Sequence, residues 1–179
     1  MKMLLSSLLI LGACTSIADG RASESSEHSI ERGRYLTKLL GCGGCHTQGA
    51  LVGEDLHSEF AGSNVGMAYG QAVDAQTPAV VFPRNLTPDV DTGIGAWTRK
   101  QIAAAIKQGR GVHKEGVLAV MPWLSYSQLE EQDGLAIADY LKSLPAVTHQ
   151  VPEPVNRGER SMYRFVRIGV YTYHPESHP

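Results

Sequence analysis

This 179-residue sequence has few cysteines, few aromatic side chains and little net charge. It contains three cysteines and 7% aromatic residues, and its formal net charge is −2 at pH 7. A near balance of charge gives no whole-chain reason to expect nucleic acid as a partner. Few aromatics beside 19 glycines leave little bulk for a hydrophobic core, so we expect a large apolar cofactor to complete it. The length favours a single domain, and the sequence shows no internal repeat.

The N-terminus has an apolar run over residues 4–11, which is too short to cross a bilayer as a stable helix. It follows the positive charge of Lys2, as in a secretory signal peptide. The run ends in "LGAC", which resembles a bacterial lipobox, so we expect Cys14 to be lipidated and to become the first residue after cleavage. Cleavage after Ala18 is the alternative, because Ser16 and Ala18 are small. Both predict export.

Composition divides the chain into four parts. Residues 1–14 are predicted to be the lipoprotein signal with its lipidated cysteine, and residues 15–29, rich in Ser and Glu, a flexible tether. Residues 30–149 are predicted to form the folded domain, and residues 150–179 a C-terminal tail. For the tail we favour a solvated strap, extended near residues 164–173, over a helix whose arginine face docks on a partner or a membrane.

Helices are predicted in three places, separated by irregular loops. A stripe of apolar residues predicts the first over residues 30–40, with Ser29 as its N-cap. The second covers residues 98–109, opened by a capping box and closed by Gly109. The third covers residues 127–144, with a second capping box from Ser127 to Glu130. Residues 47–95 show no period and are predicted to be loop, so the fold class is all-α.

The stretch "GCGGCHT" at residues 41–47 carries the chemistry. Cys42 and Cys45 are spaced C-x-x-C, which suits zinc, redox pairs or haem. A zinc site needs a second ligand pair, and the only other cysteine is Cys14; a thioredoxin-like pair follows a strand, whereas a helical stripe precedes this one. Adding His46 gives C-x-x-C-H, the signature of one covalently attached haem c. Residues i and i+3 project to the same side of a helical turn, so both thiols reach the cofactor and His46 becomes the proximal iron ligand.

A second axial ligand is expected from Met121 in "VLAVMPWLSY". It follows the second predicted helix, and Pro122 stiffens its loop. A thioether ligand favours ferrous iron and raises the reduction potential, which suits an electron carrier. Met121 as a plain core residue stays open, and Met67, His113 and, more weakly, His57 are rival ligands. The remaining histidines are predicted to be solvated: His28, His149, His174 and His178.

The order helix, "CGGCH", "NLTPD", "TGIGAW", helix, "MPW", helix resembles a class I c-type cytochrome domain over residues 30–150. It is similar to the haem domains in cytochrome subunits of bacterial membrane-bound dehydrogenases that oxidise alcohols, gluconate or sorbitol. Such subunits usually carry three domains, whereas this sequence has one motif. Residues 58–84 also depart from the shorter Gly-rich segment usual before "NLTPD".

The resemblance implies a class I fold, with helices and long loops wrapped around one haem. It implies that Gly33 and Tyr35 of the first helix meet Tyr140 and Leu141 of the last. It further places in the loop around the haem the residues Asn85, Pro88, Gly93, Ile94 and Trp97. Asn85 and Trp97 are therefore candidate cofactor contacts, Trp97 either through its indole N–H to a propionate or by packing alone.

Together these features predict a monohaem c-type cytochrome in the periplasm of a Gram-negative bacterium. It would carry one electron at a time from a dehydrogenase to a respiratory acceptor, with a lipid anchor at Cys14 and no substrate-transforming residue. It could equally be a subunit within an oxidoreductase complex. The competing class is a haem sensor or peroxidase-like enzyme, in which the sixth iron position opens to small molecules.

Overall fold

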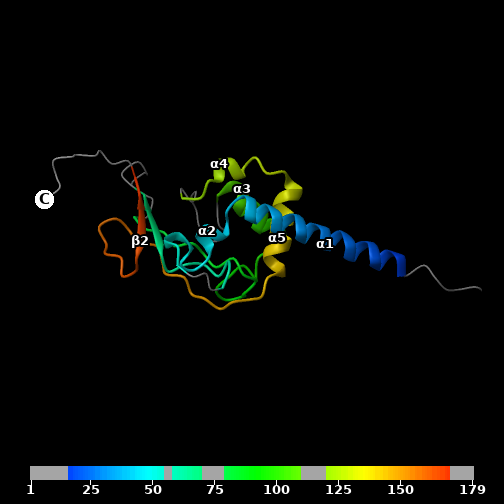
Figure 1. Ribbon diagram of the computed structural model, residues 1–179, viewed down its shortest axis with the longest axis horizontal. Coiled ribbons are helices and arrows are strands. Elements are labelled where there is room, and N and C mark those ends of the chain that lie inside the picture. Colours follow the sequence, from blue (N-terminus) through cyan, green and yellow to red (C-terminus); the bar gives the residue numbers. More distant parts are fainter. Residues whose placement is uncertain (1–15, 55–57, 70–78, 110–119, 170–179) are drawn as a thin grey trace, which may run out of the picture.

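The computed structural model describes residues 16–54, 58–69, 79–109 and 120–169 (Figure 1). These residues are mostly helical, as predicted, with one small sheet. The elements in chain order are α1 (Ser16–Leu39), α2 (Gly43–His46), a 3-10 turn (Ala50–Val52), β1 (Gly66–Tyr69), α3 (Arg99–Gln108), α4 (Trp123–Tyr126), α5 (Glu131–Ser143) and β2 (Phe165–Ile168). Among the helices so described, none is both long and apolar enough to span a membrane.

The centre of the helical part is the crossing of α1 and α5 (Figure 1). A Cβ added at Gly33 would lie 2.0 Å from the Ala136 carbonyl oxygen and 2.8 Å from the Tyr140 Cβ, so only glycine lets the two backbones approach this closely. The predicted meeting of Gly33 with Tyr140 is thus confirmed. Tyr35, however, is 56% exposed, and Leu36 is the buried residue on this face of α1.

A hydrophobic core surrounds this crossing, with contributions from α1, α3 and α5. Its buried members are Leu36, Phe60, Ile94, Ile102, Ile137, Ala138, Tyr140 and Leu141. The rings of Phe60 and Tyr140 meet edge to face, 6.0 Å between centroids. Phe60 comes from a loop, so the loop that follows α2 closes the same core as the helices.

The helix ends confirm one predicted capping box and correct the other. The Gln101 N–H donates to Thr98 Oγ1 over 3.3 Å, the Thr98 N–H donates to Gln101 Oε1 over 2.8 Å, and Gly109 ends α3 in the left-handed region. The second box is wrong. Ser127 Oγ donates instead to the Leu124 carbonyl, because the short helix α4 precedes α5.

α1 begins at Ser16, which corrects the flexible tether predicted over residues 15–29. Residues 16–29 continue the helix, and Ser29 lies inside it and not at its N-cap. The Ser29 hydroxyl donates to Asp139 Oδ2 over 2.6 Å, and the Arg32 side chain pairs with Asp133, so two contacts join α1 to α5. Ser, Ala and Glu, which are frequent before Ser29, tolerate a helix.

The second part of the molecule is built on strands, in a region predicted to be loop. β1 pairs with β2 in parallel, from Gly66 opposite Phe165 to Tyr69 opposite Ile168. Isolated bridges join Met67 to Val81 and Val80 to Val155. A small core lies here, formed by Ala68, Val80, Phe82 and Val151. The extended tail is confirmed over β2, and the helical alternative is wrong there.

Candidate haem attachment site

The motif turn, residues 41–47, follows directly from the end of α1. Gly41 takes a positive φ of 69° that stops the helix, and the Cys42 N–H donates to the Thr37 carbonyl over 3.0 Å. The chain then winds into α2, where the His46 N–H donates to the Cys42 carbonyl over 3.0 Å. Cys42 and Cys45 therefore stand one helical turn apart, with His46 next in the chain, which is the geometry that the spacing predicted.

The His46 ring is fixed by a backbone carbonyl from far along the chain. His46 Nδ1 lies 2.8 Å from the Arg84 oxygen. A carbonyl only accepts, so Nδ1 carries the proton and Nε2 keeps its lone pair. Burial lowers the pKa of the imidazole, and the bond to Arg84 opposes this shift in part. The neutral tautomer that a metal ligand requires is thus favoured by position and by burial.

Asn85 explains why the Arg84 carbonyl lies there. Its side chain is buried and makes four hydrogen bonds: Nδ2 donates to Thr92 Oγ1 at 3.0 Å and to the Val147 carbonyl at 2.8 Å, while Oδ1 accepts from the Thr87 N–H at 2.9 Å and from Thr87 Oγ1 at 2.8 Å. Both donors and both lone pairs of the amide are used within the protein. Asn85 therefore supports the site through the backbone next to Arg84, and the cofactor contact predicted for it stays a prediction.

Three hydrogen bonds tie the loop of residues 60–64 to the residues that follow Cys45. The Gly62 N–H donates to the His46 carbonyl over 2.9 Å. The Phe60 N–H donates to Thr47 Oγ1 over 3.2 Å, and the Asn64 N–H donates to Gln48 Oε1 over 2.8 Å. These contacts cannot be predicted from the sequence. They join backbone N–H groups to a carbonyl or to side-chain oxygens, and no periodic pattern marks them.

His149, predicted to be solvated, instead binds this same loop. Its Nδ1 lies 2.7 Å from the Ala61 carbonyl oxygen and its Nε2 lies 3.2 Å from Asn64 Oδ1. His28 is exposed, as predicted, whereas His174 and His178 lie outside the described residues. His149 thus connects the chain after α5 to the loop that contacts His46.

The thiols of the motif turn lie against α4. Burial raises the pKa of the Cys42 thiol to about 11 and also raises the pKa of Cys45, so both are protonated at neutral pH. Burial, followed by the nearby Cys42 and Cys45, raises the pKa of Tyr126 to about 12. The Tyr126 hydroxyl donates to the Leu40 carbonyl over 2.9 Å. α4 is therefore attached to the end of α1, immediately before the cysteines.

Met121 lies at the bend that leads into α4. Its carbonyl accepts from the Trp123 N–H over 2.8 Å, and the residue is half-buried. The rival Met67 lies in β1 and is only 8% exposed. The other rivals, His57 and His113, fall outside the described residues. The ligand role of Met121 thus stays a prediction, supported by the attachment of α4 beside the thiols.

An open cleft lies away from the motif turn, between α1 and the junction of α4 with α5. Its lining is mainly polar and includes His28, Arg32, Gln128 and Asp133. Arg32 and Asp133 pair with each other over 2.9 Å. The lining contains the imidazole of His28 but neither cysteine of the motif turn.

Comparison with known proteins identifies several cytochrome c proteins as relatives. No protein-family model matches the chain. It is 33% identical over 147 residues to the cytochrome c subunit of an alcohol dehydrogenase (quinone) from Gluconobacter oxydans, a match that covers 80% of this chain and 29% of that subunit. This chain is a relative of the cytochrome c subunits of bacterial dehydrogenases.

Two further cytochromes agree with this. The cytochrome subunit of a fructose dehydrogenase from Gluconobacter japonicus is 26% identical over 155 residues, or 82% of this chain and 29% of the subunit. A diheme cytochrome c-type protein from Cereibacter sphaeroides is 27% identical over 114 residues, 64% of this chain and 36% of its own length. This cytochrome c relative therefore spans about a third or less of the length of the curated proteins it matches.

A haem fits the residues at the motif turn of this cytochrome c relative. Two thiols and an imidazole with Nε2 unprotonated make a donor set for covalent attachment and iron ligation. A Cβ added at Gly44 would meet nothing within 4 Å, so the turn is open on that side. Within the described residues, no group of three His, Cys, Asp or Glu side chains gathers to hold a metal ion.

The Trp97 side chain is partly buried. It packs against the helical core, and its carbonyl accepts from Lys142 Nζ over 3.0 Å. This agrees with the packing alternative, while the propionate contact stays a prediction.

Proposed function

We propose that this chain is a monohaem c-type cytochrome with the class I fold, which accepts and passes on single electrons. Cys42 and Cys45 would hold the haem covalently, His46 Nε2 would bind the iron, and Met121 would bind it from the other side. The observation that carries the proposal is the hydrogen bond from His46 to the Arg84 carbonyl, because it fixes the tautomer and direction of a ligand in a C-x-x-C-H turn.

The residues of the chain would prepare the site. A bound haem would supply a one-electron iron couple. The Arg84 carbonyl holds the His46 proton on Nδ1 and so keeps Nε2 available for the metal. The burial that raises the pKa of the free Cys42 thiol also lowers the local dielectric constant. A low dielectric constant around a cofactor is one of the means by which a protein sets its reduction potential.

The relatives support a class of electron donor for this proposal. We infer that the chain serves a dehydrogenase on the periplasmic side of a bacterial membrane and passes electrons to a respiratory acceptor. The named subunits of alcohol and fructose dehydrogenases support the donor class. Residues 1–14, with the proposed lipid on Cys14, lie outside the described residues, so the lipobox sequence alone supports the anchor.

One set of variants tests the proposal. After the mass of the lipid proposed on Cys14 is subtracted, the intact mass of the mature protein should exceed that of its polypeptide by one haem. The oxidised wild type should show the weak far-red absorption of a sulfur–iron bond and, when reduced, should bind carbon monoxide poorly. Met121→Ala should remove the band and open the iron to carbon monoxide, while Met67→Ala should keep both properties.

Two results would contradict the assignment. If Met67→Ala abolishes the far-red band and Met121→Ala preserves it, the second ligand is Met67. If the reduced wild type binds carbon monoxide readily, the sensor or peroxidase-like function replaces the carrier.

A further inference from the structure

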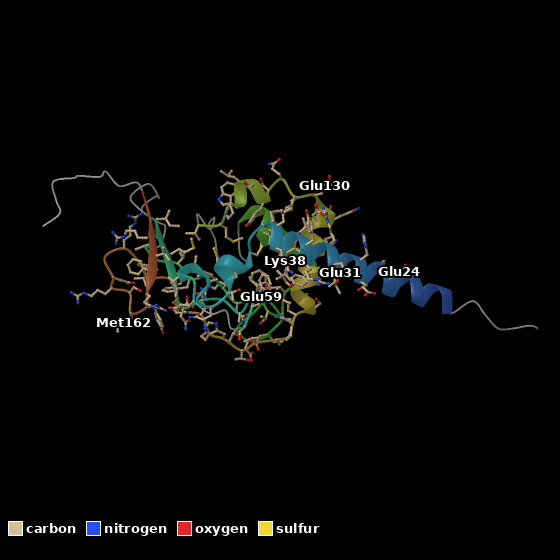
Figure 2. The ribbon with its side chains drawn as sticks, in the orientation of Figure 1. Glu24, Glu31, Lys38, Glu59, Glu130 and Met162 are labelled. Atoms are coloured by element: carbon tan, nitrogen blue, oxygen red, sulfur yellow. The ribbon has the colours of Figure 1, made fainter. Side chains whose placement is uncertain are left out.

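Several apolar side chains are exposed on residues 156–168, here named the tail surface. Met162 is 91% exposed, and Tyr163, Phe165 and Ile168 are 49%, 39% and 42% exposed. Four exposed apolar side chains within one short segment favour a contact surface, whereas single ones need no explanation. Figure 2 shows Met162 at the opposite end of the molecule from Glu24 and Glu31 on α1.

The bend that carries Met162 is held in place from three sides. Ser161 Oγ donates to the Tyr163 carbonyl over 2.7 Å and accepts from the Tyr163 N–H over 3.2 Å. The Tyr163 ring meets the buried Phe82 edge to face at 5.8 Å. Arg164 makes two hydrogen bonds, of 2.8 and 3.1 Å, to the carboxylate of Glu54. The fold thus holds an apolar side chain outward at a structured bend.

The tail surface is also basic, although the whole chain is slightly acidic. Residues 156–168 contain four arginines and one glutamate, against a net charge of −2 for the chain. Glu159 accepts from the Asn156 N–H over 3.0 Å, so it caps the local turn. Arg160 and Arg167 are exposed on either side of Met162 and Phe165. The charge of this surface is complementary to an anionic one.

We propose that the tail surface binds an anionic lipid bilayer. Met162 and Phe165 enter the boundary between headgroups and acyl chains, while Arg160 and Arg167 meet the lipid phosphates. Arginines interleaved with apolar residues on a projecting bend are the pattern of an interfacial anchor. The inference does not depend on the haem, since these residues lie outside the motif turn.

Vesicle sedimentation tests this. Full-length, haem-loaded proteins that carry Cys14→Ser are mixed with vesicles of phosphatidylcholine alone or with phosphatidylglycerol, so no acyl chain contributes and residues 1–14 contribute equally. Met162→Ser should lower binding to the anionic vesicles about tenfold, the loss of one buried apolar side chain. Val90→Ser is the matched control, because Val90 is 69% exposed elsewhere, and it should bind as the parent does.

Charge is tested in the same assay. Arg160→Ser combined with Arg167→Ser should lower binding at least about tenfold and remove the preference for phosphatidylglycerol. Lys38→Ser combined with Lys100→Ser, two exposed cations elsewhere, should change neither. The proposal is overturned if the parent protein shows no preference for anionic vesicles, or if Met162→Ser binds as the parent does. Arginine-dependent binding to polyglutamate without vesicle binding would assign the surface to an acidic protein instead.

Discussion

The helical and strand regions of this molecule contribute to the motif turn in different ways. The helical region, α1, α3 and α5 with their core, places the cysteines: Cys42 follows the end of α1 and packs against that core. The strand region, β1 and β2 with residues 61–64, 79–93 and 147–155, orients the histidine through the Arg84 carbonyl. The candidate attachment residues Cys42, Cys45 and His46 therefore lie within one short motif, while the direction of the His46 ring depends on a residue 38 positions away.

The largest expected effect comes from breaking the helical region at its closest contact. Gly33→Ala should lower the free energy of unfolding by about 3 kcal/mol, because the new Cβ would lie 2.0 Å from the Ala136 carbonyl oxygen. Alanine would otherwise favour the helix, so a loss identifies the crossing as its cause. Urea unfolding of the haem-loaded protein measures it, with the exposed His28→Ala on α1 as control. A Gly33→Ala protein as stable as the wild type would show that the helices separate at no cost.

The strand region is broken most directly at Asn85. Asn85→Ala should lower the free energy of unfolding by about 2 kcal/mol, since it leaves the buried Thr87 N–H without its partner and removes the shorter of two side-chain hydrogen bonds to the Val147 carbonyl. The Nδ1 proton of His46 should also exchange faster in NMR spectra, because the Arg84 carbonyl loses its support. Asn156→Ala, at an exposed turn, is the control. If proton exchange at His46 is unchanged, other contacts hold the Arg84 carbonyl. The strand region then does not orient His46 through Asn85.

These two regions also differ in how far the sequence predicts them. The sequence predicts α3 almost to the residue, because the Thr98–Gln101 capping box and Gly109 both act within one segment. The two cysteines and His46 form a motif for the same reason. The sequence predicts loop at β1, since four residues give no measurable alternation and the partner strand lies about a hundred positions later. The resemblance picks out Asn85, but not the hydrogen bonds that its side chain makes within the protein.

Short-range sequence patterns also predict the wrong role for some residues whose hydrogen bonds are made to distant parts of the chain. Ser29 has the side chain of an N-cap, yet its hydroxyl bonds to Asp139 across the helix crossing. Ser127 and Glu130 have the spacing of a capping box, but α4 uses Ser127 at its own C-terminal end. His149 looked like a surface residue, and its contacts with Ala61 and Asn64 follow from the path of the chain after α5.

A smaller effect is expected where α4 meets the helical region. Tyr126→Phe should lower the free energy of unfolding by about 1 kcal/mol, the value of one hydrogen bond, since it removes the bond to the Leu40 carbonyl. If Met121 is the iron ligand, the far-red band should also disappear at a lower urea concentration than in the wild type. Tyr35→Phe changes a 56% exposed phenol and should do neither. Loss of stability without earlier loss of the band would separate α4 from the ligand loop.

The smallest expected effect is a pH dependence in the strand region. Two bonds from Thr92 lower the pKa of Asp89 from its ordinary value of 3.8, and a bond from Thr148 Oγ1 at 2.8 Å lowers it further. A lowered pKa in the folded state means that the carboxylate stabilises the fold above about pH 4 and that this contribution is lost as the pH falls through the lowered value. A carbon-13 NMR titration of the Asp89 carboxyl should therefore give a midpoint below 3.8.

Replacing one threonine at a time by valine tests whether Thr92 or Thr148 lowers the pKa of Asp89 more. Thr92→Val should raise the Asp89 midpoint more than Thr148→Val, because the Thr92 hydroxyl makes the larger contribution to the lowered pKa. Thr92 Oγ1 also accepts from Asn85 Nδ2 and from the His149 N–H, so its loss should loosen His46 as well, which the Nδ1 proton exchange of His46 would report. Thr148→Val should leave that exchange unchanged, since within the described residues the Thr148 hydroxyl bonds to Asp89 and to neither Asn85 nor His149. An equal effect of both variants on His46 would mean that the whole loop, and not Asn85, supports the Arg84 carbonyl.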